Sequence, residues 1–439
     1  MVRSPESPLN PSLHIDIHRV VQAALNGVSA TRVVERALAI PDVARELDAG
    51  DLHVVAVGKA GPAMATAFLR QPGVRVARAL AIGTHAADGM PASLEFLPSS
   101  HPYPDARSRA AARAALAIAG EVRPDGKLVL LVSGGASALM AEAADGISFE
   151  DKLGATRALM LAGADIHQLN ALRKHLSLVK GGRLAASCAG ATLTLALSDV
   201  VGDDLSVIGS GPGVPDVSTW GDVASALDVC QAWDALPAPV RLAVEAGCRG
   251  TVAETPKADD PRLARSLGLV VGSAAHAVAA AREAAEAMGY AVRIWPTRVT
   301  GEAREVAPAW LSGARALARE TGGRCCILSA GETTVRVEGD GLGGRNLEFA
   351  LALTEPLRGV PGVVVASVGT DGVDGTSGVA GAVVDGGTAE RAESRGLMPA
   401  ADFLRRNDSF HYFGPLGDTV RTGRTDTNVG DLQVLLMEP

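Results

Sequence analysis

The stretch 53-HVVAVGKAGPAMATAFLR-70 predicts a strand, a tight glycine turn and a helix. Its first residues are apolar and mostly β-branched, which is typical of a buried strand, and Pro62 suits the first turn of a helix. The turn therefore lies at the carboxyl end of a strand and beside a helix N-terminus. Open α/β sheets bind ligands at that edge, and helix N-termini favour anions. We predict that Gly58, Lys59 and Gly61 contact an anionic ligand; the alternative is a surface lysine on a structural turn.

The same order of elements recurs in 128-LVLLVSGGASALMAEAA-144. An apolar strand is followed by small residues and then by a helix, so backbone N–H groups and two hydroxyls can close around a phosphate. The predicted ligand contacts here are Ser133, Gly134, Gly135 and Ser137. The alternative explanation for the glycines is a close crossing of helix and strand.

A third stretch, 167-HQLNALRKHLSLVKGGRLA-185, predicts a helix. Its apolar residues recur with helical spacing and form a stripe that faces a core. Polar residues occupy the other side and the end of the segment, and the predicted ligand contacts among them are Asn170, Arg173, Lys174 and Lys180. The alternative is a charged helix face that is simply solvated.

Carboxylates follow the next predicted strand, in 192-TLTLALSDVVGDDLSVIGSGP-212. The helix face rich in hydrogen-bond donors is therefore close in sequence to Asp199 and Asp203. Donors and carboxylates together are suited to bind a phosphorylated ligand and a metal. In the loop 99-SSHPYPD-105, His101 is a further candidate contact, with a structural role as the alternative. Asp105 is predicted to cap the helix that follows it.

The chain has 439 residues, of which 47% are apolar and 3% aromatic. That length exceeds what one hydrophobic core normally supports, so two domains are expected. The abundance of alanine, valine, leucine and glycine is typical of an α/β protein with buried strands. A net charge of −8, without a long block of like charge, argues against a nucleic-acid partner.

The five cysteines, an odd number without a C-x-x-C pair, argue against a disulfide framework and a zinc site. The N-terminal residues lack the apolar segment of a secretory signal, and no uncharged run is long enough to cross a membrane. We therefore expect a cytoplasmic protein with reduced thiols and no membrane partner. The sequence leaves open whether the protein forms a homodimer.

The second half of the chain restarts the α/β pattern after the Pro- and Ala-rich segment 234–265. Its first strand is predicted at 267–272, and 325–353 is expected to contain a strand, a turn, a second strand, a glycine-rich loop and a helix. Glycine-rich loops at strand ends in both halves predict a ligand cleft between two α/β domains. Polar candidates in this half are Glu332, Arg345, Asn346, Asp371 and Asp374. The last two are the predicted Mg²⁺ ligands, because hard cations take carboxylate oxygen and water.

Eight ordered motifs resemble the glycerate 2-kinase family, which joins an N-terminal glycerate kinase domain to a C-terminal MOFRL domain. They are VGKAGPAM, SSHPYPD, LVSGGASAL, the helix motif N-x-x-R-K-H-L-S-x-x-K-G-G-R-L, SDVVGDDLSVIGSGP, GETTVRV with GLGGRN, GTDGVDGTSGVAGAVVD, and DTNVGD. The resemblance extends from about residue 15 to the C-terminus. Some members of the family are labelled hydroxypyruvate reductases.

The resemblance implies a Rossmann-like domain with a parallel sheet in residues 1–250 and a MOFRL-type α/β domain with a mixed sheet in residues 266–439. It implies that ATP, with Mg²⁺, phosphorylates the 2-hydroxyl of D-glycerate to give 2-phosphoglycerate and ADP. Lys59, Arg345 and either Asp199 or Asp203 would then be catalytic.

The residue types fit that reaction independently. Phosphoryl transfer needs positioning and neutralisation of negative charge, which Lys59 and Arg345 would supply. It also needs an acceptor for the proton of the attacking hydroxyl, and Asp199 or Asp203 would serve.

Two other functions remain open. An NAD(P)H-dependent hydroxypyruvate reductase would usually show G-x-G-x-x-G after a strand, with an acidic residue about 20 positions further on. Neither the turn at 58–61 nor the turn at 209–213 has that context. A non-enzymatic module that binds a sugar acid or a nucleotide is the other alternative, and the many charged residues at strand ends argue against it.

Overall fold

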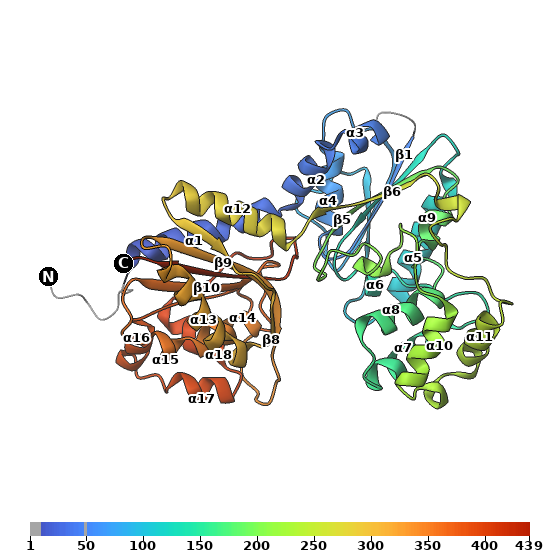
Figure 1. The fold of residues 1–439 in the computed structure, drawn as a ribbon. Coiled ribbons are helices and arrows are strands. Elements are labelled where there is room, and N and C mark those ends of the chain that lie inside the picture. Colours follow the sequence, from blue (N-terminus) through green and yellow to red (C-terminus); the bar gives the residue numbers. More distant parts are fainter. Residues whose placement is uncertain (1–9, 48–50) are drawn as a thin grey trace. The chain divides into compact units, whose positions relative to one another are not determined.

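The computed structural model describes residues 10–47 and 51–439, which form two compact units (Figure 1). We call Ala30–Val271 the N-terminal unit. The C-terminal unit consists of Gly272–Pro439 together with the N-terminal segment that ends at Ser29. Each unit has its own sheet and its own hydrophobic core. The prediction of two α/β domains is therefore confirmed.

The sheet of the N-terminal unit has the strand order β3-β2-β1-β4-β5-β6. Its strands are β1 (Leu52–Val57), β2 (Val76–Gly83), β3 (Leu94–Pro98), β4 (Lys127–Val132), β5 (Ala191–Leu197) and β6 (Ser266–Gly272). Neighbouring strands from β3 to β5 pair in parallel, as predicted. β4 and β5 are almost entirely buried, which explains why apolar residues dominate both sequences.

Helices accompany this sheet, and several of them also pack against one another. They are α2 (Ala30–Leu38), α3 (Pro41–Leu47), α4 (Gly61–Leu69), α5 (Ala106–Glu121), α6 (Ala136–Leu139), α7 (Phe149–Leu161), α8 (Ile166–His175), α9 (Arg183–Ala186), α10 (Trp220–Val229) and α11 (Ala238–Cys248). Asp105 caps α5 as predicted, because its side chain accepts a hydrogen bond from the backbone of Arg107. The helices α7, α8, α10 and α11 share a core around the buried Trp220.

The helix predicted from residue 167 to a close at residues 180–182 is shorter in the structure, because α8 ends at His175. Gly181 and Gly182 have left-handed φ angles of 57° and 79°. Their N–H groups donate to the carbonyls of Ser210 and Gly211 at 2.9 and 2.7 Å. Long-range backbone hydrogen bonds therefore replace the last two helical turns that the apolar spacing predicted.

The C-terminal unit contains a mixed sheet with the order β12-β11-β10-β13-β9-β7, and β8 also pairs with β9. Its strands are β7 (Ala291–Ile294), β8 (Val299–Glu302), β9 (Cys325–Thr334), β10 (Val363–Gly369), β11 (Gly381–Asp385), β12 (Thr419–Val420) and β13 (Asp431–Met437). β7 and β8 run parallel to β9, whereas the other pairs are antiparallel. The region predicted as strand, turn and strand after residue 325 is the single strand β9.

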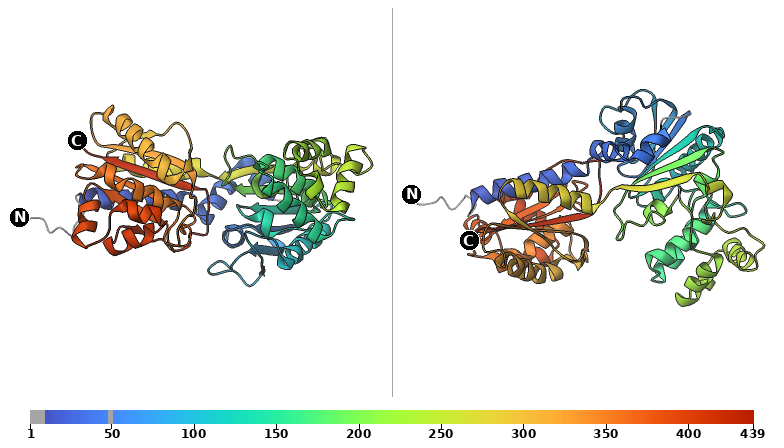
Figure 2. Two further views of the ribbon diagram at one scale, coloured as in Figure 1. Left: turned by 90° about the horizontal axis from the view of Figure 1, so that it is seen from below. Right: turned by 45° about the horizontal axis from the view of Figure 1, so that its top comes forward.

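Helices cover both faces of this mixed sheet. α1 (Pro11–Gly27) and α12 (Ala274–Ala287) lie side by side on one face (Figure 2). The other face carries α13 (Ala303–Arg319), α14 (Arg345–Ala352), α15 (Thr354–Leu357), α16 (Thr388–Ser394), α17 (Ala400–Arg405) and α18 (Ser409–Leu416) (Figure 1). No helix in the described part of the chain is long and apolar enough to span a bilayer.

The two units differ from the predicted division at residues 250 and 266. α1 packs on α12 so closely that a Cβ on Gly27 would lie 2.4 Å from the Cβ of Ala280. His14 of α1 also pairs with the buried Asp385 at 3.0 Å. β6, predicted to open the second domain, instead extends the sheet of the N-terminal unit. An apolar helix face or strand needs a partner, but its own residues do not identify which sheet provides it.

Candidate active site

Two loops meet where the neighbouring strands β1 and β4 end; we call residues 58–61 and 133–137 the paired loops. Lys59 N donates to Gly134 O at 2.8 Å, and Ala60 N donates to Ser133 Oγ at 3.0 Å. Gly58 has a φ of 127°, and a Cβ there would lie 2.1 Å from Ser133 Oγ. Glycine is therefore required at position 58 for the loops to join. The strand order reverses between β1 and β4, which is where open α/β sheets bind ligands.

Three candidate side chains border the glycines of the second loop. A Cβ on Gly134 would lie 1.9 Å from Asp199 Oδ2. A Cβ on Gly135 would lie 3.0 Å from His101 Cδ2 and 3.5 Å from Lys59 Cγ. The missing side chains thus make room for a carboxylate, an imidazole and a lysine stem, so the structure brings Lys59 and Asp199 to the same loop.

The surroundings of His101 change the pKa of its imidazole. Its pKa is lowered from the ordinary value, first by partial burial of the ring and second by the positive charge of Lys59. The imidazole is therefore mostly neutral near pH 7.

The sequence did not decide between Asp199 and Asp203 as the carboxylate of the site, and the structure distinguishes them. Asp199 follows β5 and lies against Gly134, as described above. Asp203 lies four residues later in a turn and has a left-handed φ of 54°. Within the described residues, Asp203 makes no hydrogen bond or ion pair to the paired loops. Geometry therefore favours Asp199 as the carboxylate of this site.

Both lysines predicted as ligand contacts near α8 are engaged by the protein. Lys174 Nζ binds Asp216 Oδ1 at 3.0 Å, and both side chains are buried. Lys180 Nζ donates to the carbonyls of Ser137 and Met140 at 2.6 and 3.2 Å. Lys174 therefore stabilises the helical region, whereas Lys180 holds the second of the paired loops in place.

A line of hydrogen bonds leads from that loop to α8. Ser137 Oγ lies 2.9 Å from Ser210 Oγ, and the Ser210 hydroxyl donates to Asn170 Oδ1 at 3.0 Å. Asn170 and Arg173 are three residues apart on α8 and so share a helix face. The predicted contacts Ser137 and Asn170 are thereby connected through a serine that the sequence did not single out, and Arg173 lies one turn from Asn170.

Positively charged side chains cluster around Arg173. Burial and the nearby Arg173 lower the pKa of Lys180 to about 7. The pKa of Lys152 falls well below its ordinary value because of burial and because of Lys180, Arg173 and Arg183. Burial also lowers the pKa of Arg173. These cations repel one another, so a bound carboxylate or phosphate would relieve their repulsion.

Lys180→Met is expected to weaken the rise of stability with pH above pH 7. The unfolded chain keeps the lysine proton until about pH 10.4, whereas the folded protein releases it near pH 7. Between these values the unfolded state binds more protons, so the unfolding free energy increases by about 1.4 kcal/mol per pH unit. Urea unfolding of both proteins from pH 7 to 9 measures the slopes, with Arg157→Met on exposed α7 surface as control. Equal slopes in wild type and Lys180→Met would contradict this assignment.

The C-terminal unit presents a second polar cluster at the start of α14. Arg345 Nε donates to Asp431 Oδ1 at 2.9 Å, and its Nη1 donates to Glu332 Oε1 at 3.3 Å. Asn346 Nδ2 also donates to Asp431 Oδ1 at 2.9 Å. The helix starts at Arg345, as the sequence predicts, and holds both predicted side chains around the buried carboxylate of Asp431.

Asp374 caps this helix. Its Oδ1 accepts the backbone N–H of Asn346 at 3.0 Å, and its Oδ2 accepts that of Leu347 at 2.8 Å. The side chain is buried, and burial raises its pKa to about 7, helped by the nearby charge of Asp431. Both oxygens are therefore committed to the first turn of α14.

The predicted Mg²⁺ ligands fit a metal site poorly. Asp374 serves as a helix cap, while Asp371 Oδ1 accepts the backbone N–H of Val373 at 3.2 Å. The described residues contain no group of three or more side chains arranged to hold a metal ion. The geometry thus favours a positioning role for Asp374 over the predicted metal role.

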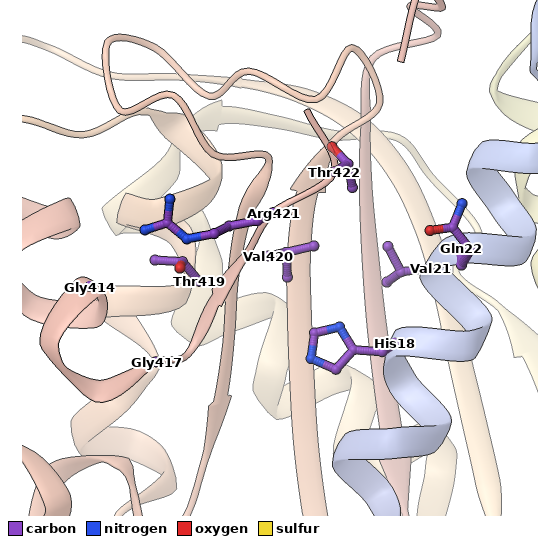
Figure 3. Close-up of a pocket in the computed structure, with 9 residues that line it drawn as sticks. All are labelled: His18, Val21, Gln22, Gly414, Gly417, Thr419, Val420, Arg421 and Thr422. Atoms are coloured by element: carbon purple, nitrogen blue, oxygen red, sulfur yellow. The ribbon is translucent and has the colours of Figure 1, made fainter. Parts of the chain in front are cut away.

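A pocket of about 380 Å³ lies in the same unit, between α1 and the segment that follows α18 (Figure 3). It is lined by His18, Val21, Gln22, Gly414, Gly417, Thr419, Val420, Arg421 and Thr422. None of the predicted site residues lines it. Thr422 packs against the loop of Asp371, because a Cβ on Gly372 would lie 2.8 Å from Thr422 Oγ1.

Two residues of these clusters were absent from the predicted contacts. Ser210 lies in a glycine-rich turn that the sequence flagged only as a turn, and Asp431 is the last residue of the DTNVGD motif. The available signal for Asp431 was a carboxylate directly before a terminal apolar run. Ser210 had no comparable signal, because its role depends on contacts 40 and 73 residues away.

Comparisons with known proteins match nearly the whole chain. A family model described as "Domain of unknown function (DUF4147)" matches residues 16–245, and the "MOFRL family" model matches residues 325–431. The chain is 34% identical over 431 residues to a Pyrococcus horikoshii protein named glycerate 2-kinase, covering 95% of this chain and 96% of that protein. It is 37% identical over 432 residues to an Agrobacterium vitis protein named putative hydroxypyruvate reductase, covering 94% and 95%.

A solved structure agrees with these relatives. The crystal structure of a glycerate kinase from Thermotoga maritima has a TM-score of 0.86 and 31% sequence identity, and the match covers 98% of this chain and all of that chain. The order of the two matched domain models is the one that the sequence motifs indicated. The chain therefore belongs to the glycerate 2-kinase family, in which a DUF4147 domain precedes a MOFRL domain.

Proposed function

We propose that this protein transfers the terminal phosphoryl group of ATP to the 2-hydroxyl of D-glycerate, giving 2-phosphoglycerate and ADP. The observation that carries the proposal is the grouping of Lys59 and Asp199 around Gly134 and Gly135, in a chain that aligns with glycerate 2-kinases over nearly its full length. A cation and a carboxylate beside a glycine loop at a sheet switch point supply what phosphoryl transfer requires.

Asp199 is the proposed acceptor for the proton of the attacking hydroxyl. As the substrate oxygen bonds to the terminal phosphorus, its proton passes to the Asp199 carboxylate and the bond from phosphorus to the ADP oxygen breaks. Gly134 lets the carboxylate lie against the loop backbone, which limits its freedom to move. Preorganised groups of this kind need little rearrangement during the reaction.

Lys59 and Arg345 are the proposed sources of positive charge. Lys59 is carried by the paired loops, whose internal hydrogen bonds fix the backbone on both sides of it. Arg345 is held by Asp431 and Glu332 at the start of α14, so its guanidinium has a defined orientation. Each would stabilise the negative charge that spreads over the phosphoryl oxygens in the transition state.

Mg²⁺ is expected for a kinase that uses ATP, but we assign no step to a cation held by this chain. Asp374 is committed to capping α14, and the described residues offer no cluster of three ligands. Magnesium sites in nucleotide enzymes commonly use substrate phosphates with only one or two carboxylates. Asp371 stays the candidate for such a single contact.

The test is an assay with purified protein, ATP, Mg²⁺ and D-glycerate, in which ADP is measured and the product is identified by phosphorus NMR. We expect stoichiometric ADP and 2-phosphoglycerate. NADH oxidation with hydroxypyruvate would instead support the name carried by the Agrobacterium vitis relative. Unchanged ATP and D-glycerate after prolonged incubation would leave a binding module as the better interpretation.

Gly134→Ala is expected to lower kcat by about tenfold or more without unfolding the protein. The new methyl group would occupy the position 1.9 Å from Asp199 Oδ2 and push the carboxylate away. A displacement of about 1 Å in a catalytic group can cost about 100-fold in rate. Steady-state kinetics and thermal unfolding of the variant measure both effects.

Gly120→Ala is the matched control, because no atom of the described part of the chain lies within 4 Å of a Cβ at that position in α5. This control should keep the wild-type kcat and gain about 0.5–1 kcal/mol of stability from the helix preference of alanine. Normal turnover in Gly134→Ala would remove the Asp199 position from the proposed mechanism.

A further inference from the structure

Two hydrogen-bond donors on α8 lack partners among the residues that the structure describes. Asn170 is buried, and its Nδ2 has no hydrogen-bond partner there. Arg173, one turn further along, makes no hydrogen bond or ion pair through its side chain within residues 10–47 and 51–439. Lys174 and Lys180 differ, because Asp216 and two backbone carbonyls occupy them. A buried donor without a partner is costly, so a ligand acceptor is its natural complement.

The orientation of the Asn170 amide is determined by Ser210. The Ser210 hydroxyl donates to Asn170 Oδ1 at 3.0 Å, so the amide oxygen faces the serine and the amide nitrogen faces away from it. Ser210 in turn contacts Ser137 of the paired loops at 2.9 Å. The free N–H groups of Asn170 therefore have one defined direction.

Ser210 occupies a strained backbone conformation. Its φ is 62°, between Gly209 at 59° and Gly211 at 60°. A serine at such an angle costs about 1–3 kcal/mol, and a third glycine would avoid this cost. The backbone conformation would favour glycine at this position, so the hydroxyl is what distinguishes serine there. A residue that orients the Asn170 amide needs that hydroxyl.

The charges around these donors favour an anion. Besides burial, the charges of Lys180, Arg173 and Arg183 lower the pKa of Lys152, and the charge of Arg173 lowers the pKa of Lys180. Two carboxylates that act on these cations are already engaged: Glu142 binds Arg109 and Arg113, and Asp216 binds Lys174. An arginine guanidinium offers two parallel donors, which match the two oxygens of a carboxylate.

We propose that Arg173 and the amide nitrogen of Asn170 bind the carboxylate of the hydroxy-acid substrate, and that Ser210 orients the amide for that contact. This inference rests on the proposed function and deepens it. The hydrogen-bond line from Asn170 through Ser210 to Ser137 ends on the loop whose glycines border Asp199 and Lys59. A substrate anchored by its carboxylate at α8 would therefore lie near the proposed proton acceptor.

Arg173→Gln tests the anchor by a comparison of two acceptors, D-glycerate and glycerol, which lacks the carboxylate. We expect the KM for D-glycerate to rise by about 10- to 100-fold, while the KM for ATP changes less than threefold. The preference for D-glycerate over glycerol, measured as a ratio of kcat/KM, should fall by a similar factor. Arg157→Gln, on the exposed surface of α7, removes the same charge and should leave all these constants unchanged.

Ser210→Gly tests the positioning role and separates it from folding. The variant relieves the strained φ but removes the hydroxyl that bonds Asn170 and Ser137, so its Tm should stay close to that of wild type. The KM for D-glycerate should nevertheless rise by about 3- to 30-fold, because the Asn170 amide loses its fixed orientation. A lowered Tm with an unchanged KM would make Ser210 a purely structural residue and overturn this part of the proposal.

The outcomes also distinguish this inference from the proposed function. If wild type phosphorylates D-glycerate but Arg173→Gln raises only the KM for ATP, the donors bind a nucleotide phosphate and the carboxylate assignment is wrong. If no constant changes in Arg173→Gln, α8 is not a ligand site. If wild type does not phosphorylate D-glycerate at all, the proposed function itself is wrong.

Discussion

Lys59→Ala is expected to lower kcat for phosphoryl transfer to D-glycerate by about 100-fold or more while the protein stays folded. The lysine stem lies against Gly135, and the paired loops that carry it are held by backbone hydrogen bonds that the substitution leaves intact. Loss of one preorganised group that stabilises transition-state charge typically costs about 100- to 1,000-fold. Steady-state kinetics measure kcat, and thermal unfolding measures whether Tm changes.

The matched control is Arg70→Ala, which removes a positive charge that follows α4, just after the helix that begins beside Lys59. Arg70 is exposed and donates to the carbonyl of Gly89, so it should affect neither kcat nor KM. Near-normal turnover in Lys59→Ala would exclude the lysine from the chemical step. A comparable loss in Arg70→Ala would indicate a general effect of charge.

Arg345→Ala is expected to lower kcat by about 100-fold or more and also to reduce stability. The guanidinium donates to Asp431, whose carboxylate is fully buried. Removing one partner of a buried ion pair leaves an uncompensated charge, which costs about 3 kcal/mol. Both effects are measurable, the first by steady-state kinetics and the second by denaturant unfolding.

The double variant Arg345→Ala with Asp431→Asn separates the two effects. The asparagine keeps the shape of the side chain and has no charge to compensate, so part of the lost stability should return, although its amide nitrogen cannot accept a hydrogen bond from Thr333 or Asn346. The kcat should stay about 100-fold below wild type, because the positive charge is still missing. Recovery of both stability and kcat in the double variant would show that Arg345 acts only by stabilising the fold.

Local chemistry made much of the fold predictable. The apolar runs of β1, β4 and β5 cannot be exposed to water, and each is followed by small residues that suit a tight turn. The start of α14 at Arg345 was predictable for the same kind of reason, since a glycine-rich loop ends there. Such features depend on neighbours within a few residues, which the sequence displays directly.

Contacts between distant residues were not predictable in this way. The sequence predicted that Lys174 and Lys180 contact a ligand, but the structure shows them bound to Asp216 and to backbone carbonyls. It also predicted one helix that closes at residues 180–182, whereas α8 ends at His175 and Gly181 and Gly182 bond instead to a turn 29 residues later. The sequence does not distinguish a charged side chain that a ligand neutralises from one that another residue neutralises, because the residue type is the same in both cases.

The amino-acid sequence alone determined the family, the alternation of strands and helices, and the set of charged residues from which a phosphoryl-transfer site can be built. Only the tertiary structure decided that Asp199 rather than Asp203 lies against Gly134, that α1 packs with α12, and that Asp374 caps a helix. The physical reason is that propensity and periodicity act along the chain. The pairing of buried polar groups instead depends on which segments meet in space, and that is settled when the whole core packs.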